Sequence, residues 1–234
     1  MKTNLLFAAS LSILGLPTLG HAALLVTGGH IDAPAFGYDT IGGFEPHIHN
    51  EGGPDGAIIG GVVQTTGSEY EPDELVFQLK STVTTSVSGT DYFWLPEGEL
   101  DAAANGLPFL GVGLEELAQG DWDGGVGTVT ITASKVSGPG EFRLWQDDGF
   151  GGVVDFINTA TATDSFTLIA GTHTHYNWGF TELGVYEIEF GISGNHVTDG
   201  AQSGSAVYTF AVPEPSTALL GVLGGLLLLR RRRG

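Results

Sequence analysis

The stretch His173-Thr174-His175-Tyr176-Asn177-Trp178-Gly179-Phe180-Thr181 combines two histidines with a run of aromatic residues. Read as one β-strand, in which side chains alternate between two faces, it places His173, His175 and Asn177 on the same face. The aromatic residues at the alternate positions then lie on the other face, where they can anchor the strand in a core. The pattern predicts a half-buried strand with nitrogen and oxygen atoms on its outer surface.

The same two-residue alternation recurs along the chain. The clearest segments are residues 75–79, 129–133, 166–170, 186–190 and 208–212, and further strands are expected near 24–27, 58–66, 82–87, 141–145 and 153–157. Clusters of glycine, asparagine, aspartate and proline separate them, and a short helix is expected only around residues 114–118. About ten strands in about 190 residues predict an all-β protein, a single antiparallel β-sandwich of jelly-roll or immunoglobulin-like type.

Both ends of the chain have the composition of targeting segments. Lys2 precedes an apolar run at residues 5–16, and the small residues around position 21 suit cleavage after Ala22. The other end has Val-Pro-Glu-Pro-Ser from Val212, an apolar run over residues 217–229 and four arginines. A helix of that length spans about 20 Å, against roughly 30 Å of bilayer hydrocarbon. We therefore expect a signal peptide (1–22), one β-sandwich metal-binding domain (23–211) and a removable sorting tail (212–234); a plain membrane helix with positive-inside arginines is the alternative for the tail.

The segment between these ends is strongly acidic. Lys2 and the four terminal arginines account for five of the eight basic residues, and Glu214 for one of the 27 acidic residues. This leaves 26 acidic residues against three basic ones in residues 23–211. Such a surface repels nucleic acid and anionic lipid and attracts cations. Nucleic acid is therefore excluded as a partner, and general solubility outside the cell is the simplest reason for the acidity.

The chain has no cysteine, which excludes disulfides and thiolate metal sites. Imidazole and carboxylate groups would have to hold a transition metal, which suits zinc, copper, nickel or iron. Two imidazoles at i and i+2 of a strand stand about 7 Å apart at their bases and can converge on one ion. His173 and His175 are therefore the first candidate ligands, with Asn177 beside them.

The segment Gly28-Gly29-His30-Ile31-Asp32 supplies a third imidazole. By the same alternation His30 and Asp32 share a face, and His30 with His173 and His175 makes three imidazoles, the usual minimum for a zinc site. Asp32 is expected either as a ligand or as the acceptor for the second ring N–H of a ligating histidine. A solvated turn is the alternative for this segment.

A second His-x-His pair, His47 and His49, lies where Pro46 favours an edge strand or a loop. We expect one of these two histidines to complete the metal shell, with Glu45 or Glu51 as an alternative ligand or as a group that orients the imidazoles. The alternative for the pair is ordinary exposed surface. His196 is expected to lie in an exposed turn.

The sequence gives less support to other functions. Neither the His-Glu-x-x-His nor the Gly-x-Ser-x-Gly motif occurs, so no catalytic residue is assigned and an enzyme is unsupported. The aspartates at 121–123 and 147–148 lack the spacing of an EF-hand, and Asp-Gly pairs favour turns. Trp94, Trp122 and Trp145 either line a sugar-binding face or lie in the core and at the rim of the sandwich.

Two parts of the chain resemble known families. The end of the chain from Val212 resembles the PEP-CTERM sorting signal of Gram-negative exporters, in which the same motif precedes an apolar helix and an arginine cluster. The block from His173 to Tyr186 resembles a repeat of surface-anchored, choice-of-anchor bacterial proteins that often accompany metal-transport genes, and Gly29-His30-Ile31-Asp32 is similar to their Gly-His-Val-Asp start. Together these features resemble the PEP-CTERM proteins repressed by the zinc-uptake regulator.

This resemblance implies a protein made under zinc shortage and exported to the periplasm, the outer surface or the extracellular matrix. It implies motif residues at His30, Asp32, His173, His175 and Asn177, and the sorting machinery and a zinc transporter or envelope component as partners. We therefore expect a zinc-binding protein for zinc acquisition, storage or delivery at the envelope, with other divalent transition metals as alternatives. A structural or adhesive matrix protein with an incidental or structural metal is the second hypothesis, and a zinc-dependent hydrolase is the third.

Overall fold

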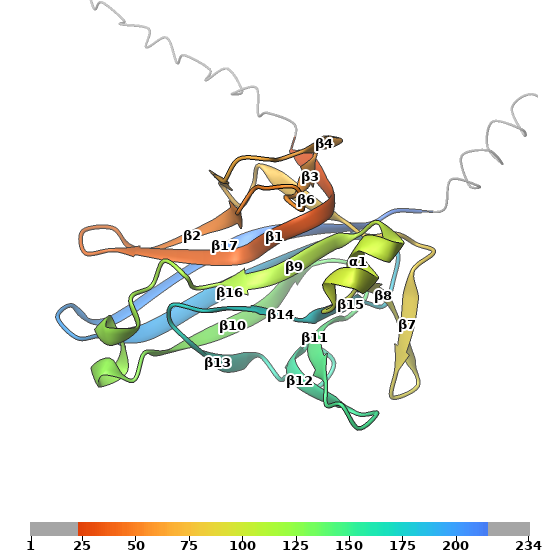
Figure 1. The fold of residues 1–234 in the computed structure, drawn as a ribbon. Coiled ribbons are helices and arrows are strands. Elements are labelled where there is room, and N and C mark those ends of the chain that lie inside the picture. Colours follow the sequence, from red (N-terminus) through yellow and green to blue (C-terminus); the bar gives the residue numbers. More distant parts are fainter. Residues whose placement is uncertain (1–22, 215–234) are drawn as a thin grey trace, which may run out of the picture.

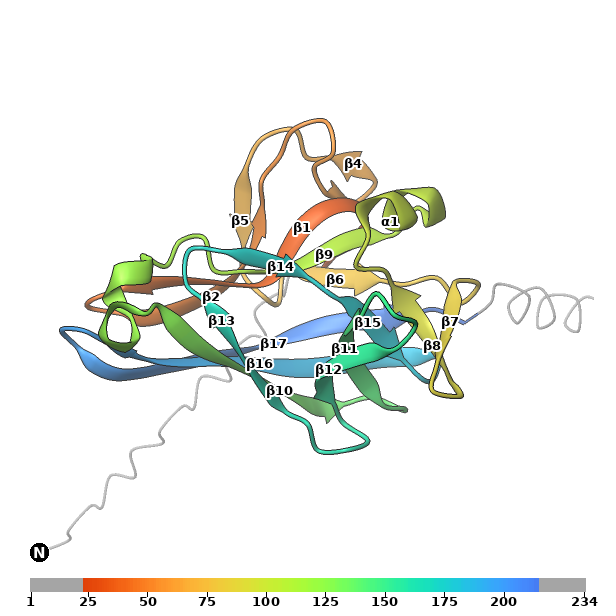
Figure 2. The ribbon, with the colours of Figure 1, turned by 60° about the horizontal axis from the view of Figure 1, so that its bottom comes forward.

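The computed structural model describes residues 23–214, and Figures 1 and 2 show the arrangement of its strands. The predicted signal peptide and residues 215–234 of the predicted sorting tail lie outside the described residues. Within residues 23–214, every helix is too short or too polar to span a bilayer.

The described chain folds into two β-sheets. The larger, of 12 strands, has the order β13-β10-β16-β17-β6-β1-β2-β5, with β3, β4, β9 and β14 joined beside β1 and β9. Its strands are β1 (Leu24–Asp39), β2 (Gly43–Asn50), β3 (Ile58–Ile59), β4 (Val62–Val63), β5 (Ser68–Tyr70), β6 (Leu75–Gln78), β9 (Pro108–Gly113), β10 (Thr128–Ser137), β13 (Ser165–Ile169), β14 (His173–His175), β16 (Gly184–His196) and β17 (Gly200–Val212). The smaller sheet has the order β12-β11-β15-β8-β7, with β7 (Thr84–Val87), β8 (Thr90–Leu95), β11 (Phe142–Asp147), β12 (Val153–Asn158) and β15 (Asn177–Phe180).

The predicted all-β sandwich is confirmed. The small sheet lies against one end of the large sheet, and the long β16–β17 hairpin runs the length of the molecule (Figure 1). Most strand pairs are antiparallel, but β1 pairs in parallel with β6 and β9, and β6 pairs in parallel with β17. The large sheet is therefore mixed, which the expectation of a purely antiparallel sandwich did not include.

The core forms where the inner faces of the two sheets meet. Alternation along β16 buries Tyr186, Ile188 and Phe190 and turns Glu187 outward. The Trp178 ring of the small sheet lies 5.6 Å from that of Phe190. Each large apolar side chain buried in this way contributes about 1.5–3 kcal/mol, so this core is a major source of the stability of the sandwich.

The segment around Tyr176 crosses from one sheet to the other. β14 pairs with β9 of the large sheet, whereas β15 pairs with β8 and β11 of the small sheet. Tyr176 between them is 0% exposed, and its ring lies 4.9 Å from Phe156 and 5.5 Å from Phe166. The prediction that His173, His175 and Asn177 share one strand face is therefore wrong, because the chain changes sheets at the buried tyrosine.

The helix lies elsewhere than predicted. It is α1 (Glu99–Asn105), and it ends at Gly106, whose left-handed backbone (φ 59°, ψ 50°) lets the next amide, of Leu107, return to the Ala102 carbonyl. Residues 114–118 form a turn instead, because Leu114 and Leu117 are both buried and the Leu117 N–H donates to the Leu114 carbonyl. Two short 3-10 turns follow, at Gln119–Asp121 and Asp123–Gly125.

The prediction that His196 lies in an exposed turn is wrong, because its side chain is buried. It is the last residue of β16, is 6% exposed and packs between Tyr38 and Trp122, with ring centroids 4.7 and 5.1 Å away. The β16–β17 hairpin extends further than its hydrophobic pattern and carries this histidine under the neighbouring aromatic rings.

Candidate metal centre

β9 brings the candidate ligands together because it lies between β1 and β14. β1 pairs in parallel with β9, which sets Asp32 beside Gly111. β14 pairs with the other edge of β9 in the antiparallel sense, which sets His175 beside the same glycine. Residues about 140 positions apart in the sequence thus meet across one strand, since His30 and His175 are separated by 145 positions.

The three imidazoles of His30, His173 and His175 converge. Their ring centroids are 5.0 Å (His30–His175), 5.3 Å (His173–His175) and 5.7 Å (His30–His173) apart. The Nε2 atoms of His30 and His175 are 3.2 Å apart, and each ring offers a nitrogen within 4.8 Å of the others. Ligand atoms of a tetrahedral zinc ion, bound at about 2.0–2.1 Å, stand about 3.3 Å from one another. The spacing of the imidazoles therefore fits such an ion.

Glycines of β9 make room for this arrangement. A Cβ atom on Gly111 would lie 2.0 Å from Asp32 Oδ1 and 3.0 Å from His175 Cε1. A Cβ atom on Gly113 would lie 3.0 Å from both the Asp32 Cβ and a Glu115 carboxylate oxygen. Any larger residue at position 111 would displace the carboxylate from the imidazoles.

Asp32 lies beneath the imidazoles and has no partner. It is 0% exposed, neither carboxylate oxygen has a hydrogen-bond partner in the described residues, and Oδ1 is 3.7 Å from His30 Nε2. Burial, together with the neighbouring Glu115 carboxylate, raises the pKa of Asp32 to about 7. A buried carboxylate without a partner is costly, and a bound cation would supply the missing partner.

Two glutamates complete an acidic rim. Glu115, just after β9, hydrogen-bonds His173 Nδ1 through Oε1, and Glu51 Oε2 lies 3.4 Å from His30 Nδ1. Together with Asp32 and His173 they form a second group whose ligand atoms lie within 4.8 Å of one another. Carboxylates in these positions fix the orientation of the imidazoles. Glu51 was a candidate ligand from the sequence, whereas Glu115 was not.

Burial favours the neutral form of two of the rings. The His175 ring stacks on Phe109, with centroids 3.6 Å apart and planes at 7°. Burial, reinforced by the neighbouring His30 and His173, lowers the pKa of His175 to about 3, and burial also lowers the pKa of His30. Neutral imidazole is the form that binds a metal.

The other predicted residues lie apart from this group. β2 pairs with the edge of β1 opposite to β9, and neither His47 nor His49 joins a set of three or more such ligand atoms within residues 23–214. His47 Nδ1 donates to the Glu45 carbonyl at 3.0 Å, and its Nε2 lies 3.2 Å from a carboxylate oxygen of Glu116. Asn177 is on the small sheet. The structure thus brings Asp32 and Glu115, rather than the second histidine pair, to the three imidazoles, and metal binding by His47 or His49 stays a prediction.

No family model, curated protein or solved structure matches this chain.

Proposed function

We propose that the protein is an exported zinc-binding protein of the cell envelope, which holds zinc through His30, His173 and His175 with Asp32 as the fourth ligand. The observation that carries the proposal is a group of three imidazoles whose nitrogens lie within 4.8 Å of one another, beside a fully buried carboxylate that has no partner among the described residues. Without a cation, this arrangement leaves polar atoms unpaired in the interior of a protein that otherwise has an extensive apolar core.

The donor set favours zinc over harder cations. Calcium and magnesium prefer six or more oxygen ligands, whereas three imidazole nitrogens beside a carboxylate suit zinc. Copper and nickel also bind imidazole, and the Irving–Williams order places copper above zinc. Zinc would lower the pKa of the ligand atoms it binds and neutralise the Asp32 charge, while Glu51 and Glu115 hold the imidazoles in place.

The exposure of the site favours exchange of the metal rather than permanent burial. The side chains of His173 and Glu51 are 37% and 49% exposed, whereas Asp32 is enclosed. The site is thus closed on the side of Asp32 and open to solvent on the side of His173 and Glu51, where an ion can enter and leave. The acidic surface raises the local concentration of cations. These features support acquisition, storage or delivery of zinc.

The test is a zinc titration, with metal analysis, of the full chain carrying no histidine tag. We expect stoichiometric zinc in the wild type and loss of tight binding in the His173→Ala/His175→Ala variant. His47→Ala/His49→Ala is the matched control, because it removes the same pair of side chains from outside the group, and we expect it to keep its zinc. Binding that survives the first change and disappears with the second would place the site on β2 and refute the proposal.

Chelation separates the roles of a bound metal. If the protein stays folded after treatment with a chelator and takes zinc up again, the metal is cargo, as proposed. Unfolding on chelation would assign the metal to folding and support the second candidate, a structural or adhesive matrix protein. That candidate is also favoured by a tryptophan-lined pocket on the small sheet.

A further inference from the structure

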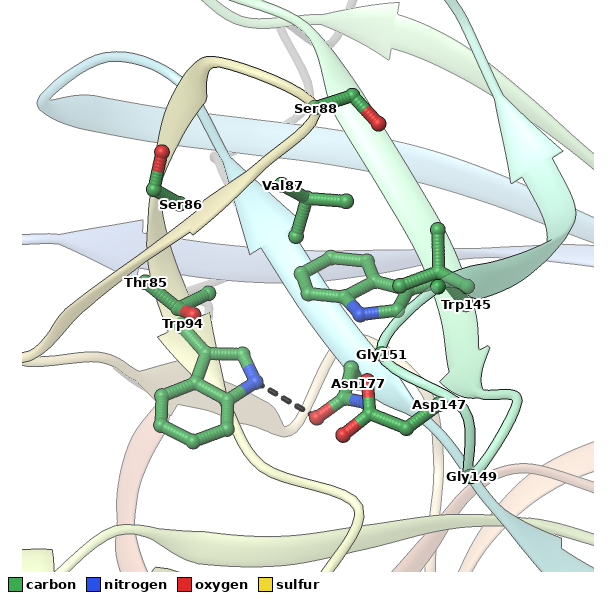
Figure 3. A pocket seen from close by; sticks show the side chains of 12 residues that line it. Thr85, Ser86, Val87, Ser88, Trp94, Trp145, Asp147, Gly149, Gly151 and Asn177 are labelled. Carbon is green, nitrogen blue, oxygen red and sulfur yellow. Dashed lines mark hydrogen bonds between the residues drawn. The ribbon is translucent and has the colours of Figure 1, made fainter.

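The outer face of the small sheet carries a pocket of about 440 Å³ that shares no residue with the metal centre. Its walls come from all five strands of that sheet and from the glycine-rich loop between β11 and β12. Figure 3 shows Trp94, Trp145, Asp147 and Asn177 around this pocket. Its volume falls within the range of about 300–1,000 Å³ that is typical of sites for small molecules.

Strand register explains why these side chains share the outer face. Trp145 of β11 is paired with Asn177 of β15, and Trp94 of β8 is paired with Gly179 of β15. Alternation sends the intervening apolar residues to the core, as with the fully buried Trp178. Gly179 lets the Trp145 indole pack closely over β15, since a Cβ atom there would lie 2.6 Å from Trp145 Cζ3 and 2.8 Å from Tyr92 Cδ1.

An unpaired amide donor lies at this pocket. Asn177 is 2% exposed, and its Oδ1 accepts hydrogen bonds from Trp94 Nε1 at 2.7 Å and from the Glu97 N–H at 3.0 Å (Figure 3 shows the first). These two bonds fix the amide so that Oδ1 is occupied. Its Nδ2 has no partner among the described residues. A buried donor of this kind indicates an acceptor supplied from outside the chain.

The charges around the pocket narrow the choice of ligand. Asp147 is an acceptor, and no lysine or arginine lines the pocket, so an anion has no partner there. A quaternary ammonium ion would suit the indoles and the carboxylate, but it offers nothing to the Asn177 N–H. Arg143, which lies 5.7 Å from the Trp145 ring, is bound to Asp155 at 2.7 Å. The ligand must therefore donate and accept hydrogen bonds and carry no net negative charge.

We propose that this pocket binds a unit of a neutral saccharide. Sugar hydroxyl groups both donate, here to Asp147, and accept, here from Asn177. The C–H face of a pyranose ring is apolar and packs on an aromatic face, for which the half-buried Trp94 is available. Trp145 is almost fully buried and forms the fixed back wall. A protein with this site would attach to neutral polysaccharide independently of the metal centre.

The experiment is calorimetric titration of the full chain with neutral hexasaccharides of the cello, xylo, manno, galacto and N-acetylchito series, beside choline and hexagalacturonate. We expect binding to at least one neutral sugar, with quenching or a shift of tryptophan fluorescence, and none to choline or hexagalacturonate. Trp94→Ala and Asp147→Ala should each weaken binding by about tenfold or more. Ile41→Ala, at a 95% exposed apolar position on the β1–β2 turn, is the matched control and should leave affinity unchanged.

The outcomes separate this proposal from the metal site. Asp147 is exposed, so its replacement tests the pocket even if Trp94→Ala fails to fold, which near-ultraviolet circular dichroism would reveal. Binding should persist in a chelator and in His173→Ala/His175→Ala. Absence of binding to every neutral sugar, preference for choline or the anionic sugar, or full affinity in a folded Asp147→Ala protein would overturn the proposal. Loss of sugar binding on chelation would overturn its independence from the metal.

Discussion

Asp32→Asn separates the two effects that Asp32 has in the proposed metal centre. In the metal-free protein the ionised carboxylate lies in the interior without a partner, whereas asparagine has nearly the same shape and no charge. In the zinc-bound protein the same charge contacts the ion. The variant should therefore be more stable than the wild type without metal and should bind zinc more weakly.

The magnitude follows from the pKa of Asp32. Burial, with the help of Glu115, raises this pKa from its ordinary value of 3.8 to about 7, so the folded protein keeps a proton that the unfolded chain releases between these two pH values. The wild type therefore loses stability as the pH rises from about 4 to about 7. At about 1.36 kcal/mol per pKa unit, three units correspond to about 4 kcal/mol by pH 8. For a domain of this size 1 kcal/mol moves Tm by about 2–4 °C, so the variant should gain about 8–16 °C at pH 8 and almost nothing at pH 4.

Thermal unfolding followed by circular dichroism at pH 4, 6 and 8 in a chelator, and at pH 8 with zinc, measures both effects. Asp39→Asn is the matched control: Asp39 is an exposed aspartate whose pKa is lowered by the N–H groups of Gly42 and Ile41, so its replacement should not stabilise the protein. With zinc at pH 8, the Tm of the wild type should rise more than the Tm of the variant. An Asp32→Asn protein that is less stable than the wild type at pH 8 in the chelator, or whose gain does not depend on pH, would refute the reasoning.

Two further predictions concern the same centre. Zinc affinity should fall as the pH drops through about 7, because the ion must displace the Asp32 proton. Protons compete with zinc for His175 only at far lower pH, since its pKa is about 3. Calorimetry from pH 5.5 to 8 measures this, and the same dependence of affinity on pH near pH 7 in Asp32→Asn would contradict it. Gly111→Ala should weaken zinc binding by about tenfold or more and cost about 1–3 kcal/mol of stability, because its Cβ would lie 2.0 Å from Asp32 Oδ1. Gly120→Ala, with nothing within 4 Å of its Cβ, should change neither zinc affinity nor stability. If the two alanine variants had equal effects in zinc titration and in thermal unfolding, the close approach of Gly111 to Asp32 would not be the cause.

The fold could be predicted from the sequence wherever a strand has one face in water. β10, β16 and β17 show clear alternation because their outer residues are exposed or half-buried. β1 was expected to end near residue 27 but extends to Asp39. Residues 31–37 are all buried, and a segment with two buried faces has no alternation between polar and apolar residues to detect.

For the proposed metal centre, only the histidines and Asp32 could be predicted from the sequence. The pairs His47/His49 and His173/His175 look equivalent along the chain, and what distinguishes them is which edge of β1 each strand lies on. That depends on β9, whose place between β1 and β14 is a long-range property. Glu115 and the clearance at Gly111 follow from the same pairing, so local patterns carried no signal for either.

The crossing at Tyr176 explains how one short segment contributes to two sites. In a continuous strand, His175 and Asn177 would face the same surface. The buried Tyr176 ring instead holds the chain where it leaves β9, and the His175 carbonyl accepts a hydrogen bond of 2.8 Å from Gln146 Nε2 on β11. β11 also carries Trp145, the back wall of the pocket on the small sheet. The His175 imidazole therefore remains with the large sheet and the Asn177 amide with the small one, so the residues that suggested a single ligand row from sequence belong to two separate proposed sites.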